Sequence, residues 1–124
     1  MTLRQVHADF AWVVVLTNAA VGLWALAAHL QERWRSPLLW RATLVAELTI
    51  FVEVILGVAL VSLQDYEVAQ FHAFYGFIAI ATVGIVYSYR HQLEAHLYVL
   101  YGLGGLFLMG LALRAMAISP VPTP

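Results

Sequence analysis

Two acidic residues lie within a long apolar run, and they are the first candidates for chemistry. Glu47 and Glu53 are the acids of residues 37–63, where most neighbours are Leu, Val, Ile, Phe or Ala. An ionisable side chain inside a membrane is costly and usually marks a functional site. The two glutamates are six positions apart, so they project from a helix in directions that differ by roughly 120°. We therefore do not expect them to form a carboxylate pair on one helix face.

Three roles remain open for these glutamates. In the first, a neutral Glu donates a hydrogen bond to a backbone carbonyl or to Asn18, because the loss of solvent disfavours the charged form. In the second, Glu47 and Glu53, with Asn18 opposite, supply the oxygen atoms of a proton relay or a cation site. In the third, one glutamate faces a partner subunit and pairs with an arginine or histidine there.

Asn18 belongs to a face of small and polar residues. Asn18, Gly22, Ala25 and His29 follow one another at helical spacing and share one side of a helix. Such a face is typical of helices that pack closely in a membrane, where an asparagine often hydrogen-bonds a neighbouring helix. Asn18 is therefore either a polar contact between helices or part of the lining of a polar site.

His72 is the second feature that could do chemistry. Gly76 follows it by one helical turn, on a face of small residues. A haem site needs this combination, because the imidazole binds iron and the gap beside it admits the porphyrin. An ordinary histidine beside a close helix contact has the same pattern.

The five histidines divide between the two ends of the expected bundle. His7 and His72 fall at one end, and His29, His91 and His96 fall at the other. A membrane b-type cytochrome binds haem through two histidines of different helices at the same depth. The pairs His7–His72 and His29–His96 meet this condition, and the same residues could instead contact quinone or lipid.

Several classes of function are excluded. The chain has no cysteine, which excludes disulfides, thiolate chemistry and cysteine-ligated metal centres within it. Its formal net charge is −1 and it has no basic patch, so we expect no nucleic-acid partner. No spacing typical of a hydrolase or of a zinc protease is present, and we predict no metal site and no catalytic activity of its own.

Composition predicts the elements that must position these residues. The chain has 124 residues, of which 63% are hydrophobic and 10% charged, and these values are typical of an integral membrane protein. A helical span needs about 20 apolar residues. The sequence predicts one all-α domain over residues 1–124, a bundle of four antiparallel transmembrane helices with short loops. The expected spans are residues 10–30, 37–63, 68–89 and 97–118.

Local signals predict where two of these helices begin. We expect the first helix to begin at Asp9, or at a residue just before it, as N-cap. Pro37 suits the first turn of the second helix, with Ser36 as the N-cap.

The arginines predict an orientation in the membrane. Basic residues favour the cytoplasmic side. They divide between the first and third connections, with Arg33, Arg35, Arg41 and Arg90, and the terminal regions, with Arg4 and Arg114. We therefore expect loops one and three in the cytoplasm and both termini outside, in the plasma membrane of a prokaryote.

These features favour a small non-catalytic accessory subunit of a larger membrane complex, such as a respiratory complex. Small-residue faces occur on more helices than one bundle must use internally, so we expect other integral membrane subunits or copies of this chain as partners, besides lipid. One alternative is an electron-transfer protein that binds b haem or quinone through His72, His7, His29 or His96. Another is an oligomeric proton-coupled transporter in which Glu47 or Glu53 titrates.

Overall fold

The four apolar runs form four helices in the computed structural model, which describes residues 1–118. Each is long and apolar enough to cross a membrane, so the predicted all-α bundle of four potential spans is confirmed. The shortest helix has 19 residues and is therefore about 28 Å long, close to the thickness of the hydrocarbon core. The helices are α1 (Leu3–Leu30), α2 (Pro37–Gln64), α3 (Gln70–Ser88) and α4 (Leu97–Ala117), with short 3-10 turns at Glu32–Trp34 and Glu94–His96.

Helix α1 begins earlier than the sequence pattern predicted, and the predicted N-cap at Asp9 is wrong. Thr2 is the N-cap: its hydroxyl accepts a hydrogen bond from the backbone N–H of Gln5 at 3.2 Å. The side-chain carbonyl of Gln5 accepts one from the backbone N–H of Thr2 at 2.9 Å. This reciprocal capping box supports two additional polar turns before the apolar run starts. His7 therefore lies on a helix.

Helix α2 begins where the sequence predicted. Ser36 caps it by accepting a hydrogen bond from the backbone N–H of Leu38 at 3.1 Å, and Pro37 occupies the first turn. The helix ends at Gln64, and its C-cap, Asp65, adopts a left-handed conformation with φ of 54°. This residue turns the chain towards α3.

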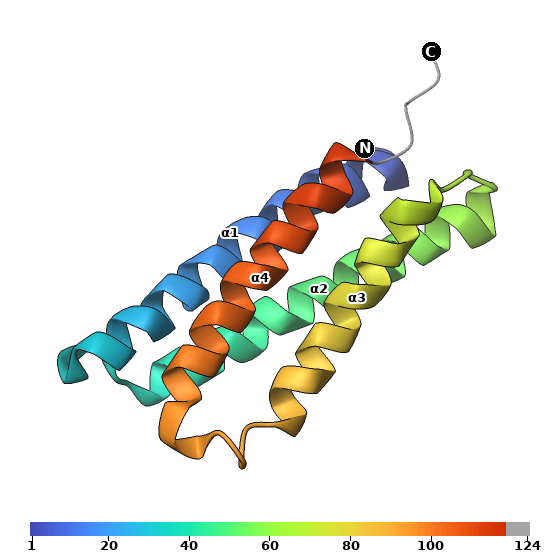
Figure 1. Cartoon of the computed structure of the whole chain (residues 1–124). Helices are drawn as coiled ribbons and strands as arrows, with labels where there is room; N and C mark the ends of the chain where they lie inside the picture. Colours follow the sequence, from blue (N-terminus) through green and yellow to red (C-terminus); the bar gives the residue numbers. More distant parts are fainter. Residues whose placement is uncertain (119–124) are drawn as a thin grey trace.

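The helices run alternately up and down, and α1 is the best-packed of them (Figure 1). It lies against both α4 and α2, and α3 packs mainly on α4. Contact between α2 and α3 is much smaller. The N-terminus and the end of α4 lie at the same end of the bundle as the α2–α3 connection (Figure 1).

Glycines allow α1 and α4 to approach each other closely. A Cβ atom added at Gly105 would lie 2.9 Å from the Cα atom of Gly22, and one added at Gly22 would lie 3.0 Å from the carbonyl oxygen of Gly102. These distances are too short for any side chain larger than a hydrogen atom. The predicted small-residue face of α1 is therefore buried at Asn18, Gly22 and Ala25.

Two clusters of apolar side chains fill the interior. The larger joins all four helices through Val14, Ile50, Val83, Leu108 and Leu111. The smaller lies near the α1–α2 connection and is built on Ala25, Ala28 and Leu39. Side chains of all four helices meet in the larger cluster, and polar groups of the bundle lie around it.

Candidate functional site

His7 and Glu53 meet near the end of the bundle that holds the N-terminus. The Nδ1 atom of His7, on α1, lies 3.1 Å from the Oε1 atom of Glu53, on α2, and the two side chains are only 21% and 16% exposed. Both atoms are inaccessible to solvent, and neither forms a hydrogen bond of normal angles. The contact is therefore electrostatic, and it is an ion pair when His7 is protonated.

His72, on α3, is held by the backbone of α4. Its Nδ1 atom lies 2.7 Å from the carbonyl oxygen of Ala115, near the end of α4. A carbonyl oxygen only accepts hydrogen bonds, so Nδ1 must carry the proton. In the neutral ring, Nε2 then keeps a free lone pair that can bind a metal.

The two imidazole rings lie edge to face in the bundle. Their centres are 6.2 Å apart, and their planes are inclined by 78°. His7 comes from α1, Glu53 from α2, His72 from α3 and the carbonyl of Ala115 from α4, so every helix contributes to this cluster. We call these four groups the histidine cluster.

One glycine packs against a ring of the histidine cluster, and another lies one turn from the second histidine. A Cβ atom added at Gly57, on α2, would lie 3.1 Å from Cε1 of His7 and 3.5 Å from its Nε2 atom. On α3, a Cβ atom added at Gly76, one turn from His72, would have no neighbour within 4 Å. Gly57 thus lets the His7 ring pack directly on α2, and open space remains at Gly76.

The histidine cluster can offer two imidazole ligands, but it is not a site for a bare metal ion. Within residues 1–118, no group of three or more His, Cys, Asp or Glu side chains is arranged to hold one. Two neutral imidazoles suit a metal that already has its other ligands, as the iron of haem does. Arg114 is exposed next to Ala115 and supplies positive charge at this end.

The other three histidines do not form a comparable site. His29, His91 and His96 are all exposed, and none of them shares a ring contact with another histidine in the described part of the chain. The pairing of His29 with His96 that their positions permitted is therefore not found. Exposed imidazoles at helix ends are readily solvated by water and headgroups.

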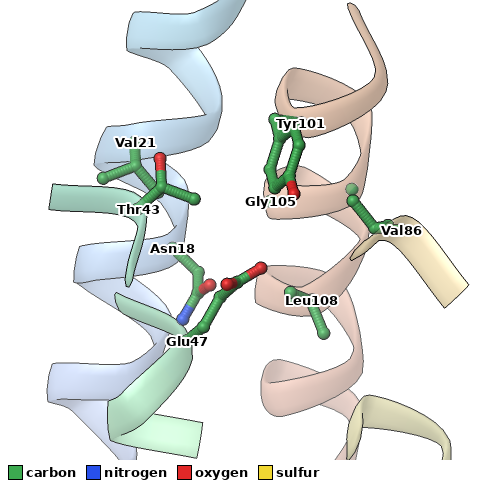
Figure 2. A pocket seen from close by; sticks show the side chains of 9 residues that line it. Asn18, Val21, Thr43, Glu47, Val86, Tyr101, Gly105 and Leu108 are labelled. Carbon is green, nitrogen blue, oxygen red and sulfur yellow. The ribbon is translucent and has the colours of Figure 1, made fainter. Parts of the chain in front are cut away.

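Glu47 lies deeper in the bundle, beside a cavity of about 10 Å³ (Figure 2). Its polar lining comes from three helices, with Asn18 on α1, Thr43 and Glu47 on α2 and Tyr101 on α4. Apolar side chains and the glycines of α4 close the rest. A void of this size holds about one water molecule. We call it the Glu47 cavity.

Asn18 joins α1 to α2 beside this cavity. Its side-chain amide donates to the carbonyl of Val14 at 2.9 Å and to the carbonyl of Ala46 at 3.3 Å. Asn18 is thus a polar contact between helices, and it also lines the cavity, so the two roles that the sequence left open coexist. With both N–H groups used, its amide oxygen remains available as an acceptor.

The structure places the two glutamates in different surroundings. Glu53 contacts His7, and Glu47 lies with Asn18, so Glu47, Glu53 and Asn18 do not converge on one site. Sequence reasoning missed Tyr101 and the carbonyl of Ala115. No pattern in the sequence singles them out, because both come from α4 and only helix packing brings them there.

Comparison with known proteins provides no further guide to function. No protein-family model, no curated protein and no solved structure matches the chain.

Proposed function

We propose that this chain is a small membrane electron-transfer protein that binds one b-type haem between His7 and His72. The observation that carries the proposal is the histidine cluster, in which two rings from diagonally opposed helices lie edge to face. Nδ1 of His72 is hydrogen-bonded to the carbonyl of Ala115, and Nδ1 of His7 lies 3.1 Å from the carboxylate of Glu53. Bound haem would supply one-electron transfer. The residues of the chain would bind the haem and hold it in position.

The spacing of the two rings agrees with this role. Metal-bound histidine nitrogens lie about 2.0–2.1 Å from the metal, which gives roughly 6 Å between the centres of two rings on opposite sides of one iron. The observed separation is 6.2 Å. Two rings in direct edge-to-face contact can have the same separation, so the distance supports the proposal only together with the orientation of the Nδ1 atoms.

The partners of the Nδ1 atoms also agree with ligand histidines. A histidine that binds a metal usually donates its other ring N–H to a carboxylate or a backbone carbonyl, which fixes the tautomer and the ring orientation. Glu53 is the carboxylate beside His7, and Ala115 supplies the carbonyl beside His72. Both Nε2 atoms are thereby left for iron.

Space for a flat ligand is open on the side of α3. Gly76 lies one turn from His72, and a Cβ atom added there would meet nothing within 4 Å, whereas Gly57 packs against the ring of His7. We infer that a planar group would enter from the side of Gly76. Arg114, at the same end, provides a cation for the carboxylates of such a group.

The absorption spectrum of the purified protein tests the proposal. The chain would be expressed in bacteria supplied with a haem precursor and purified in a mild detergent. We expect a Soret band and, after reduction, the sharp visible bands of haem iron with two histidine ligands. His7→Ala and His72→Ala should each lose the bound haem, whereas His29→Ala and His91→Ala should keep it. A colourless wild type that also fails to bind added haem would overturn the proposal.

Membership of a larger membrane complex is a second candidate, and one observation favours it. Phe71, Phe74 and Phe77 form a stripe on α3 and are 68%, 51% and 67% exposed. Buried residues are also fewest on α3. Such a helix has a wide face available to another subunit or to lipid, and an accessory subunit needs such a face.

Purification from the native membrane distinguishes the two arrangements. A tagged chain isolated in a gentle detergent should bring larger integral membrane subunits with it in fixed stoichiometry if it belongs to a complex. Recovery of the chain alone, or only with copies of itself, would contradict the accessory role. Neither result decides whether haem is bound, since an electron-transfer protein can work alone or as a subunit.

A further inference from the structure

We propose that the Glu47 cavity holds one water molecule and that Glu47, together with this water, forms a proton-binding site inside the bundle. This site lies apart from the histidine cluster. Glu47 and Glu53 are six positions apart on α2, or about 9 Å along its axis. The inference does not depend on the binding of haem.

An unpartnered hydroxyl group is the first evidence for the water. Thr43 is 7% exposed, and its Oγ1 atom is buried without a hydrogen-bond partner. A buried polar group in this state costs free energy unless a water or ion satisfies it. Thr43 lines the Glu47 cavity, which has room for about one water.

The polar lining of the cavity can satisfy such a water. A buried water usually makes two to four hydrogen bonds. The hydroxyls of Thr43 and Tyr101, the amide oxygen of Asn18 and the carboxyl of Glu47 all border the space. Figure 2 shows the Glu47 carboxyl beside the Asn18 amide and pointing towards α4, on the side to which the Tyr101 hydroxyl is directed.

Within residues 1–118, Glu47 forms no ion pair with a basic side chain. The ion pairs in residues 1–118 involve Glu53 and Glu32. Among the residues of the other helices that line the cavity, only Tyr101 can titrate; they are Asn18 and Val21 of α1, Val86 of α3, and Tyr101, Gly104, Gly105 and Leu108 of α4. Glu47 itself, Arg90 just after α3 and Tyr87 near the end of α3 act electrostatically on Tyr101. A carboxyl without a counter-ion in these surroundings favours its neutral acid form.

The same groups can stabilise Glu47 with or without its proton. The neutral acid donates to the water or to the amide oxygen of Asn18, which can only accept. The carboxylate accepts from the water and from the hydroxyls of Tyr101 and Thr43, because a hydroxyl can donate or accept. One proton passes from a hydronium ion of the solvent through the cavity water to the carboxylate, and it leaves by the reverse path. No bond other than O–H bonds forms or breaks.

Infrared difference spectroscopy during pH steps tests this site. The protein would be reconstituted into lipid vesicles as purified, with or without bound haem. We expect a carboxylic-acid C=O band whose amplitude changes with pH. Glu47→Gln should remove the band, whereas Glu94→Gln, at an exposed position, should leave it intact. Thr43→Val should shift the frequency of the band, because the water loses one of its partners.

Two results would overturn the inference. One is a Glu47→Gln protein that remains helical and monodisperse and yet keeps the full band. The other is an unchanged band frequency in Thr43→Val, which retains the shape of the side chain without its hydroxyl and is therefore expected to fold. The infrared experiment reads out a carboxyl vibration, whereas the visible spectrum reports haem binding. Failure of the proton-binding site is therefore distinguishable from failure of haem binding.

Discussion

The orientation of His7 and His72 is decided by single atoms on other helices. Oε1 of Glu53 lies beside Nδ1 of His7, and the carbonyl oxygen of Ala115 lies beside Nδ1 of His72. A ring with its Nδ1 atom engaged presents Nε2 on its other side, as a ligand histidine does. At the residue scale, the proposed haem binding would therefore depend on these two contacts and on the glycines Gly57 and Gly76.

We predict that Gly57→Ala lowers haem content several-fold. The new methyl group would lie 3.1 Å from Cε1 of His7, so the ring must shift away from its position next to Glu53. The amount of haem per purified protein, from the Soret absorbance, measures the effect. Gly84→Ala is the control, because a methyl group there meets nothing within 4 Å. Equal haem content in the two variants would contradict the prediction.

At the element scale, α1 matters most, because it contacts two helices extensively and carries both His7 and Asn18. Its first turns exist because Thr2 and Gln5 form a capping box. Its middle approaches α4 closely because three glycines meet there. Each of these features gives a prediction about stability.

Removal of the cap should loosen the start of α1. Thr2→Ala loses the acceptor for the backbone N–H of Gln5, and the loss of an N-cap costs about 0.5–2 kcal/mol. We expect faster amide hydrogen exchange at Gln5 and Val6, measured by mass spectrometry. Thr2→Ser retains the hydroxyl and should preserve slow exchange. If the alanine and serine variants exchange equally, the cap does not stabilise the helix.

The contact between α1 and α4 should not tolerate a methyl group. In Gly105→Ala the added carbon would lie 2.9 Å from the Cα atom of Gly22 and 3.0 Å from the carbonyl oxygen of Asn18. Both are backbone atoms, so the helices must separate, at a cost of about 1–3 kcal/mol. The free energy of unfolding in detergent micelles measures this loss.

Gly110→Ala is the matched control on the same helix. Its methyl group would have no neighbour within 4 Å. We expect unchanged or slightly higher stability, since alanine favours a helix over glycine. Equal losses of stability at positions 105 and 110 would show that helix packing is not the cause.

At the scale of the whole molecule, the even number of helices places the start of α1 and the end of α4 at one end of the bundle (Figure 1). Four arginines lie in or near the connections at the other end: Arg33, Arg35, Arg41 and Arg90. Four of the six basic residues gather there, which favours that end as the cytoplasmic one. The histidine cluster would then lie near the outer surface.

Labelling of introduced cysteines tests this orientation. The chain has no cysteine of its own, so a single one gives an unambiguous signal. We expect Glu67→Cys, in the α2–α3 connection, to react with a membrane-impermeant thiol reagent in intact cells. Glu94→Cys, in the α3–α4 connection, should react only after permeabilisation. The reverse pattern would place the termini in the cytoplasm.

The sequence by itself determined the helices, because about 20 apolar residues per span is a requirement of the bilayer and is visible in one dimension. It also identified Glu47, Glu53, Asn18, His7 and His72 as candidates, since polar side chains stand out among apolar ones. The start of α1 was missed because the polar turns from Leu3 lie before the apolar run, and Thr2 and Gln5 were not recognised as a cap.

Only the tertiary structure decided which of these residues meet. The sequence permitted both His7–His72 and His29–His96, but side-chain contacts depend on helix rotation and crossing, and these follow from packing at Gly22, Gly102 and Gly105. That packing set His7 beside Glu53 and His72 beside Ala115, and it left Glu47 with Thr43 and Tyr101 around a cavity. Contacts between distant parts of a chain have no local signal, because they are properties of the assembled bundle.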